Sequence, residues 1–89
     1  MRTRRKPQPA RRYEAQVLDI KAALGRGLRR RRAAGKISQG RLAARLGSSQ
    51  SRISKIEAGD PAVSLDLFIR ALFATGATRG DIARAMGSV

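Results

Sequence analysis

The sequence predicts an all-α domain of five helices, preceded by a basic N-terminal arm at residues 1–12. Apolar residues recur at steps of three and four positions, the spacing that places side chains on one side of a helix. Glycines, each followed shortly by a serine or threonine, separate these periodic segments and indicate where helices end and begin. No segment shows the alternating pattern of a strand, so we expect no β-sheet.

The predicted arm carries six basic side chains and two prolines but almost nothing apolar. A segment of this kind cannot bury enough surface to offset the entropy lost on ordering it. We therefore expect residues 1–12 to be flexible.

The first helix is expected to run to Ala34. Its apolar residues lie three and four positions apart and so share one face; they are Tyr13, Val17, Ile20, Leu24 and Leu28. Gly25 and Gly27 each weaken a helix by up to about 1 kcal/mol relative to alanine. The pattern therefore leaves open one helix with a soft point or a helix that starts near Asp19. Gly35 is the natural C-terminal stop.

The next two helices are short and are separated by about three residues. The first is expected from Gln39 to Leu46 and the second up to Ala58 or Gly59. Their capping and turn residues are Ser38, Gly47, and Ser48 or Ser49. Their buried positions are predicted to be Leu42, Ala43, Leu46, Ile53 and Ile56.

The last two helices follow a turn at Asp60 and Pro61. Ser64 is expected to cap the fourth helix, which ends at Gly76 and carries Leu65, Phe68, Ile69 and Leu72 on its apolar side. Thr78 and Asp81 have the spacing of a capping box at the start of the fifth helix, whose apolar residues are Ile82, Ala83 and Met86.

The composition excludes several classes of protein. At 89 residues the chain holds one domain, and it has neither cysteine nor histidine, so a disulfide or a zinc site cannot stabilise it. The same absence removes the commonest acid-base and thiol side chains, which argues against an enzyme, and nothing indicates a cofactor. No apolar run approaches the roughly 20 residues that cross a bilayer, so we expect a cytoplasmic protein.

Positive charge is concentrated in the first two thirds of the chain. The net charge is +14, and residues 1–59 hold 17 basic and 3 acidic side chains, whereas residues 60–89 hold three of each. Solubility alone does not require charges to be sorted in this way. The distribution favours contact with a nucleic acid, followed by a neutral packing or dimerisation segment.

Residues 39–58 (QGRLAARLGSSQSRISKIEA) have the pattern of a helix-turn-helix. Such a unit needs a small residue where its helices cross, a glycine at the turn and apolar side chains that lock the second helix onto the first. Ala43 is the small residue, and Gly47 is free to adopt the left-handed conformation of the turn. A larger residue at position 43 would push the helices apart. An ordinary helical hairpin is the alternative.

Residues 19 to 76 resemble the phage-repressor and Cro-like (XRE) family of helix-turn-helix regulators. The stretches that carry the resemblance are Gly35 to Gln39, Leu42 to Gly47, Ile53 to Gly59, and Ser64 with Leu65, together with Leu28 and Arg32. The resemblance implies a repressor-like fold, a bacterial or phage origin and a homodimer that docks one helix in the major groove of double-stranded DNA.

The resemblance also implies which side chains meet the bases. Gln50, Ser51 and Lys55 match the positions that face base edges, with Ser49 and Arg52 at the margin. Their chemistry suits this role, because glutamine pairs with adenine, lysine donates to guanine, and serine serves either. A solvated polar side chain is the alternative for each of them.

Other matched positions imply backbone contacts and a structural pair. Gln39 matches the residue that ties the start of the helix to a phosphate, and Lys36 and Arg41 are weaker candidates for the same role. Arg32 and Glu57 match a partly buried ion pair that joins the first helix to the end of the third. Such a pair fixes orientation more than it stabilises, because desolvation offsets much of the attraction.

Three features lie outside these assignments. Arg29, Arg30 and Arg31 are expected to form a solvated face. The basic residues of the arm could lie along a DNA groove or have no specific role; they are Arg2, Arg4, Arg5, Lys6, Arg11 and Arg12. Ala58 departs from the family, which often has a longer polar residue there, and this puts one backbone contact in doubt.

The leading hypothesis is a transcriptional repressor that binds a two-fold operator as a homodimer, with half-sites roughly 34 Å apart. The dimer contact is expected in the C-terminal segment, through Phe73, Ile82 and Met86. One alternative is an antitoxin that silences a partner toxin and regulates its own operon. Another is an architectural or RNA-coating protein that binds through charge alone.

Overall fold

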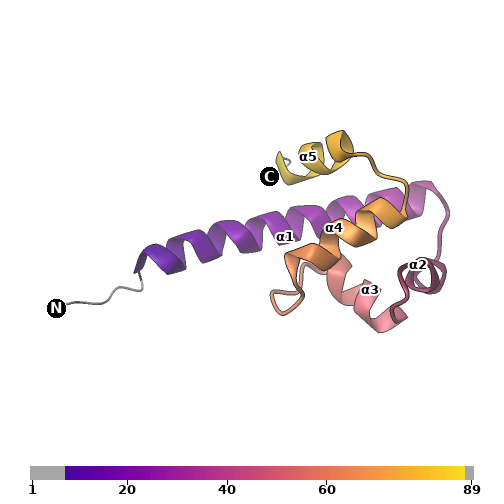
Figure 1. Cartoon of the computed structure of the whole chain (residues 1–89), viewed down its shortest axis with the longest axis horizontal. Coiled ribbons are helices and arrows are strands. Elements are labelled where there is room, and N and C mark those ends of the chain that lie inside the picture. The colour runs from indigo at the N-terminus through magenta and orange to yellow at the C-terminus, as the bar shows by residue number, and fades with distance from the viewer. Residues whose placement is uncertain (1–7, 88–89) are drawn as a thin grey trace.

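The computed structural model describes the backbone of residues 8–87 and the side chains of residues 13–87. Within this range the chain forms five α-helices and no strand, which confirms the predicted all-α fold (Figure 1). The helices are α1 (Gln8–Ala34), α2 (Gln39–Leu46), α3 (Gln50–Glu57), α4 (Leu65–Ala74) and α5 (Arg79–Gly87). None of them is long and apolar enough to span a bilayer.

Helix α1 is a single continuous helix of 27 residues, about 40 Å long. It begins at Gln8, so residues 8–12 belong to a helix and not to the flexible arm predicted for them. Pro9 is compatible with this start because the first turn of a helix needs no backbone N–H at that position. The rest of the predicted arm lies outside the described residues. Figure 1 shows that the N-terminal part of α1 extends beyond the other helices.

The two glycines of α1 mark close contacts between helices. A Cβ atom added at Gly25 would lie 2.5 Å from the backbone oxygen of Ile56 and 2.9 Å from that of Glu57. At Gly27 it would lie 3.1 Å from the Cβ of Ala85. The glycines therefore do not interrupt the helix. They let the end of α3 and one side of α5 approach its backbone.

The hydrophobic core lies between the C-terminal half of α1 and the other four helices. Leu24 and Leu28 of α1 are fully buried against side chains from α2, α3 and α4. Ile82 of α5 is also part of this core and only 7% exposed, so it packs within its own chain, whereas Phe73 and Met86, the other two residues of the predicted dimer contact, are exposed. Ala85 is buried on α5, whereas Ala83, which was expected on the apolar side, is exposed.

Four helices each end in a turn of the same type, in which one residue adopts the left-handed conformation. Gly47, Gly59 and Gly76 take this position after α2, α3 and α4, but after α1 it is Lys36, with φ 55°, and not the predicted Gly35. The amide of Ile37 then donates to the carbonyl of Arg32, five residues earlier, and this hydrogen bond closes the turn. A residue with a side chain is strained there, because its Cβ crowds the backbone.

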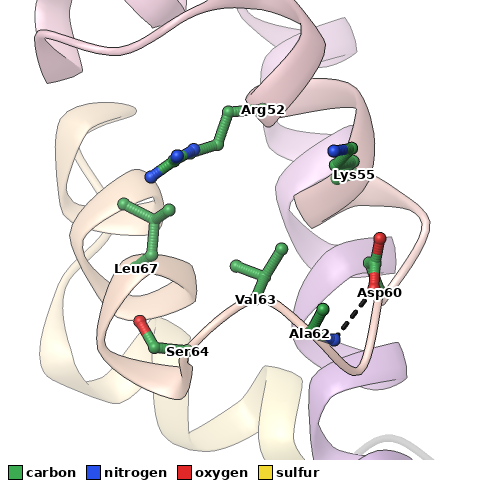
Figure 2. A pocket seen from close by; sticks show the side chains of 7 residues that line it. All are labelled: Arg52, Lys55, Asp60, Ala62, Val63, Ser64 and Leu67. Atoms are coloured by element: carbon green, nitrogen blue, oxygen red, sulfur yellow. Dashed lines mark hydrogen bonds between the residues drawn. The ribbon is translucent and has the colours of Figure 1, made fainter.

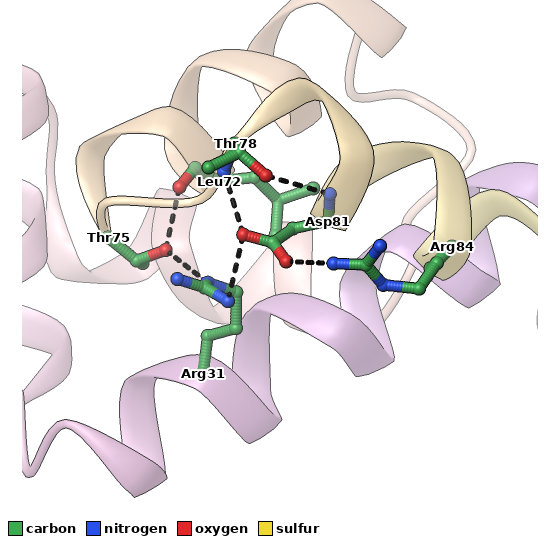
Figure 3. A network of polar contacts seen from close by, with 6 residues as sticks. All are labelled: Arg31, Leu72, Thr75, Thr78, Asp81 and Arg84. Atoms are coloured by element: carbon green, nitrogen blue, oxygen red, sulfur yellow. Dashed lines mark hydrogen bonds and ion pairs between the residues drawn. The ribbon is translucent and has the colours of Figure 1, made fainter.

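Helix α5 is attached to α1 by a polar network (Figure 3). The predicted capping box forms: the amide of Thr78 donates to Asp81 at 2.8 Å and the amide of Asp81 donates back to Thr78 at 3.1 Å. Arg31 lies 3.5 Å from Asp81 and donates to the hydroxyl of Thr75 at 3.0 Å, so Arg31 is not part of a purely solvated face. Arg29 and Arg30 are exposed.

Candidate nucleic-acid interface

The unit formed by α2 and α3 has the local geometry of a helix-turn-helix. Ser38 caps α2 and Ser49 caps α3, each through a side-chain oxygen that accepts a backbone N–H three residues on, at 3.0 and 3.1 Å. Gly47 lies between them in the left-handed conformation (φ 66°), as predicted, and its amide donates to the last turn of α2. The turn therefore needs only Gly47, Ser48 and Ser49.

The two helices are locked together by apolar side chains. Leu42, Ile53 and Ile56 are fully buried and Leu46 is partly buried. Ala43 is 4% exposed within the same core cluster. This burial fixes the direction of α3, because its two isoleucines turn one side of the helix inward and leave the opposite side to solvent.

The outward side of α3 carries the side chains that the resemblance assigns to base contacts. Gln50, Ser51, Arg52 and Lys55 are all exposed. The hydroxyl of Ser49 already accepts a backbone hydrogen bond as a cap, but its own proton remains available to donate. None of these residues is covered by the chain itself, so the surface can meet a long polymer.

Ser54 belongs to the same surface, although the sequence analysis did not single it out. It is exposed and lies four positions after Gln50, which places the two side chains on one face. The signal was present in the sequence, since helical spacing alone puts Ser54 between Gln50 and Lys55.

The starts of α2 and α3 lie beside each other. A Cβ atom added at Gly40 would be 3.9 Å from the side-chain oxygen of Gln50. The N-terminal turn of α2 therefore lies next to the place where the candidate reading surface begins. Free backbone N–H groups at a helix start favour an anion.

A polar chain of three side chains holds this arrangement together. The predicted pair forms: Arg32 donates to both carboxylate oxygens of Glu57, with Nη2 at 3.1 Å from Oε1. Gln39 donates from Nε2 to the same Oε1 at 3.1 Å. Arg32 also donates to the carbonyl of Ile37 at 3.1 Å, just before α2. Glu57 thus ties α1, α2 and α3 to one another.

The charges and hydrogen bonds around Glu57 and Arg32 favour the ionised form of both side chains. Burial pushes the pKa of the Glu57 carboxyl upward, but hydrogen bonds from Arg32 and Gln39 and the nearby arginine charges outweigh it, so the pKa is lowered. The hydrogen bond with Glu57 raises the pKa of Arg32 further above its already high value. The side chains of Glu57 and Arg32 are only 6% and 18% exposed, so removing either would leave the other charge poorly solvated.

The three candidate phosphate contacts occupy different environments. Arg41 is exposed in the first turn of α2, and Lys36 is exposed in the turn before it. Gln39 is half-buried and gives one of its two amide protons to Glu57, which leaves the second for a further acceptor. Gln39 is therefore oriented by Glu57 and does not swing freely.

A pocket of about 330 Å³ lies between α3 and the start of α4 (Figure 2). Arg52 and Lys55 line it from α3, and the side chain of Arg52 reaches across toward Leu67 of α4. Ser64 stands at the N-cap of α4 as predicted, but its hydroxyl makes no capping hydrogen bond. Sequence reasoning assigned Ser64 only to capping and so missed that it lines the same pocket as Arg52 and Lys55.

The loop that borders this pocket is held from behind by α1. Lys21 is 9% exposed and its Nζ donates to the carbonyl of Pro61 at 3.0 Å. Gly59 also meets α1 closely, since a Cβ added there would lie 2.9 Å from the Cα of Ala22. The side of the pocket formed by the loop is therefore anchored to the main body.

These features define a class of protein. A capped, locked helix-turn-helix presents a polar helix face with hydrogen-bond donors, and cations surround that face, which is the arrangement of a DNA-binding domain. Residues 8–87 hold no group of three or more acidic side chains that could bind a metal ion.

Comparison with known protein families agrees with this class. The family model of a helix-turn-helix domain matches residues 23–87, which is most of the chain. The chain therefore belongs to this helix-turn-helix family, one of the XRE-like group, and the resemblance found in the sequence is confirmed. No curated protein and no solved structure matches it.

Proposed function

We propose that the protein is a transcriptional regulator that binds double-stranded DNA in a sequence-specific manner. The observation that carries this proposal is the exposed polar side of α3. Its side chains can donate hydrogen bonds to the edges of DNA bases, and those meant here are Gln50, Ser51, Ser54 and Lys55. Charge supports it, because residues 1–59 carry 17 basic side chains against 3 acidic ones. A polyanion would be drawn to this part of the molecule.

The base contacts are assigned to Gln50, Ser51, Ser54 and Lys55. Gln50 can pair with the edge of an adenine through two hydrogen bonds, and Lys55 can donate to a guanine. The serine hydroxyls donate or accept and add discrimination only where the base offers the matching group. Each good pair contributes about 1 to 3 kcal/mol of preference for the correct base.

Backbone phosphates are assigned to residues on both sides of α3. Arg41, Lys36 and the second amide proton of Gln39 would contact one strand at the start of α2. Arg52 and the free hydroxyl of Ser64 would contact a phosphate in the pocket before α4, so we place Arg52 on the backbone and not on a base. Such contacts fix position and orientation without reading sequence.

A binding experiment with exposed variants tests the assignment. Selection from a random duplex pool should yield a preferred site. Gln50→Ala and Lys55→Ala should each reduce the ratio of affinities for the selected and a random duplex about tenfold. Both side chains are exposed, so the melting temperature should stay within the range of a surface substitution.

Arg41→Ala is the matched control for that experiment. It should weaken binding to both duplexes by the same factor and reduce the salt dependence of binding. If Gln50→Ala lowered both affinities equally, the base-reading role would be refuted. If no duplex were preferred at any salt concentration, charge-only binding would replace the proposal.

We further propose that the protein acts as a repressor and binds a two-fold operator as a homodimer, with half-sites one helical turn or a whole multiple of it apart. A protein that occupies a promoter site through one compact domain blocks the polymerase by exclusion. The antitoxin alternative stays a prediction of the sequence.

A further inference from the structure

The projecting part of α1 carries apolar side chains that its own chain does not cover. Tyr13 is 64% exposed and Val17 is 40% exposed, whereas Ile20 is half-buried and Leu24 is fully buried in the core. The four residues are spaced by four, three and four positions, so they form one continuous stripe. The core side of α1 thus continues past the body of the protein into solvent (Figure 1).

The projecting part lies outside the residues that the family model matches. The family match begins at residue 23, after Tyr13, Val17 and Ile20. Lys21 and Ala22, which contact the loop after α3, are the last residues before that match. Residues 13–19 therefore form an exposed extension, and Ile20 lies at the border with the core.

The spacing indicates what kind of surface covers the stripe. Apolar residues that alternate in steps of four and three are the pattern of the seam between two paired helices. The same spacing is found on any helix face that packs on an apolar surface, as Ile20 and Leu24 show here. A second helix with a similar stripe is a partner that fits this pattern.

We propose that residues 13–20 of α1 pair with the same segment of a second copy of this chain and so form the homodimer. This inference rests on the proposed function, because a two-fold operator requires two copies. In a two-fold dimer the same segment of each copy forms the interface, so the apolar stripe of one copy would cover that of the other.

The charge distribution favours a second copy over an acidic partner. Residues 13–21 hold Glu14 and Asp19 against one basic residue, Lys21, whereas residues 22–59 hold ten basic residues and one acidic residue. An acidic partner would bind more strongly to that second segment. Two copies of so basic a body repel each other, and residues 13–21 add no net positive charge of their own to a contact between them.

The stripe is short, and this sets the expected strength. Stable dimers bury about 800 Å² on each partner, which a segment of eight residues, about one heptad, does not reach on its own. We therefore expect a dimer with a dissociation constant in the range of about 1 to 10 μM, tightened when both copies occupy one operator.

Sedimentation of the full chain without DNA, over concentrations up to about 100 μM, tests the proposal. The wild-type protein should be dimeric at the upper end, and Val17→Glu should be monomeric at every concentration. Ala15→Glu is the matched control: it adds the same charge to the same extension but on the opposite side of the helix, and it should remain dimeric. Phe73→Glu tests the exposed apolar residue of α4 and should also remain dimeric.

Three results of this experiment would overturn the proposed dimer. A wild-type protein that stays monomeric at about 100 μM overturns the proposal, as does equal behaviour of Val17→Glu and Ala15→Glu or loss of the dimer only in Phe73→Glu. A chain that is monomeric alone but needs Val17 to bind another protein would also overturn it. Val17→Glu should still bind a single half-site duplex with wild-type preference. Loss of that preference in every variant and in the wild type would contradict the proposed function and leave the oligomeric result intact.

Discussion

The two parts of α1 differ in what they contact, although one helix contains both. From residue 23 onward α1 is surrounded by α3, α4 and α5, and its apolar residues Leu24 and Leu28 are fully buried. Between residues 13 and 19 the same side of the helix is exposed. The helical pattern is continuous across both parts, so the pattern alone does not tell which part forms the core.

The two parts of α1 also differ in their glycine content. Gly25 and Gly27 both lie in the packed part, at the points where backbone or Cβ atoms of other helices come closest. The projecting part contains no glycine between residues 8 and 24. A helical glycine here reports a neighbour at close range, because its lower helix propensity is offset by the contact it permits.

The largest effect is expected from Gly25→Ala. The added methyl group would overlap the carbonyl oxygens of Ile56 and Glu57, which are backbone atoms and cannot rotate away. We expect a loss of about 2 to 3 kcal/mol in the free energy of unfolding, against the gain of up to about 1 kcal/mol that alanine brings to an isolated helix. Thermal and urea denaturation measure the difference.

Ala15→Ser is the control for the projecting part. It also adds one atom to α1, but at an exposed position, and should change stability by no more than about 0.5 kcal/mol. Destabilisation of similar size in both variants would show that the two parts of the helix are equally packed.

Most of the fold could be predicted from the sequence because the residues that start and end its helices act locally. Ser38, Gly47 and Ser49 determine the helix boundaries through hydrogen bonds within a few residues, and these boundaries agree with the structure. The start of α1 was not predictable in the same way, because basic residues and prolines suggested an arm, whereas the first turn of a helix tolerates Pro9. The role of Ile82 depended on tertiary packing, which its own periodicity does not specify.

The candidate site was predictable to a different degree. The exposure of Gln50 and Lys55 follows from the burial of Ile53 and Ile56 on the other side of α3. The hydrogen bond from Gln39 to Glu57 joins residues 18 positions apart, and the free hydroxyl of Ser64 depends on how the loop enters α4. Both are long-range or geometric facts that no short motif encodes.

Acid should weaken the packed part of α1 through the ion pair of Glu57 with Arg32. The pKa of Glu57 is lowered in the folded protein, so its pairing with Arg32 contributes stability above the unfolded pKa, and this contribution is lost as the pH falls through the folded pKa. The melting temperature should therefore fall from about pH 4 downward. Glu57→Gln should be less stable than wild type at neutral pH and should lose less on acidification.

Glu14→Gln is the matched control for the acid experiment, since it removes a carboxylate from the exposed extension. Its acid profile should follow the wild type. Because the pKa of Asp81 is also lowered, by hydrogen bonds from Thr78, part of the acid sensitivity should persist in Glu57→Gln. Identical acid profiles for Glu57→Gln and wild type would show that the pair with Arg32 does not couple folding to pH.

The smallest effect is expected where the packed part of α1 ends. Lys36 takes the left-handed position that glycine takes after α2, α3 and α4, so Lys36→Gly should relieve strain and stabilise the protein by about 0.5 to 1 kcal/mol, or several degrees in melting temperature. Lys36→Ala removes the same charge but keeps a Cβ, and should bring no such gain. If Lys36 also contacts a phosphate, both variants should weaken binding to selected and random duplexes by one common factor. Equal stabilisation by glycine and alanine would mean that removing the charge, and not relieving the backbone, is what stabilises this turn.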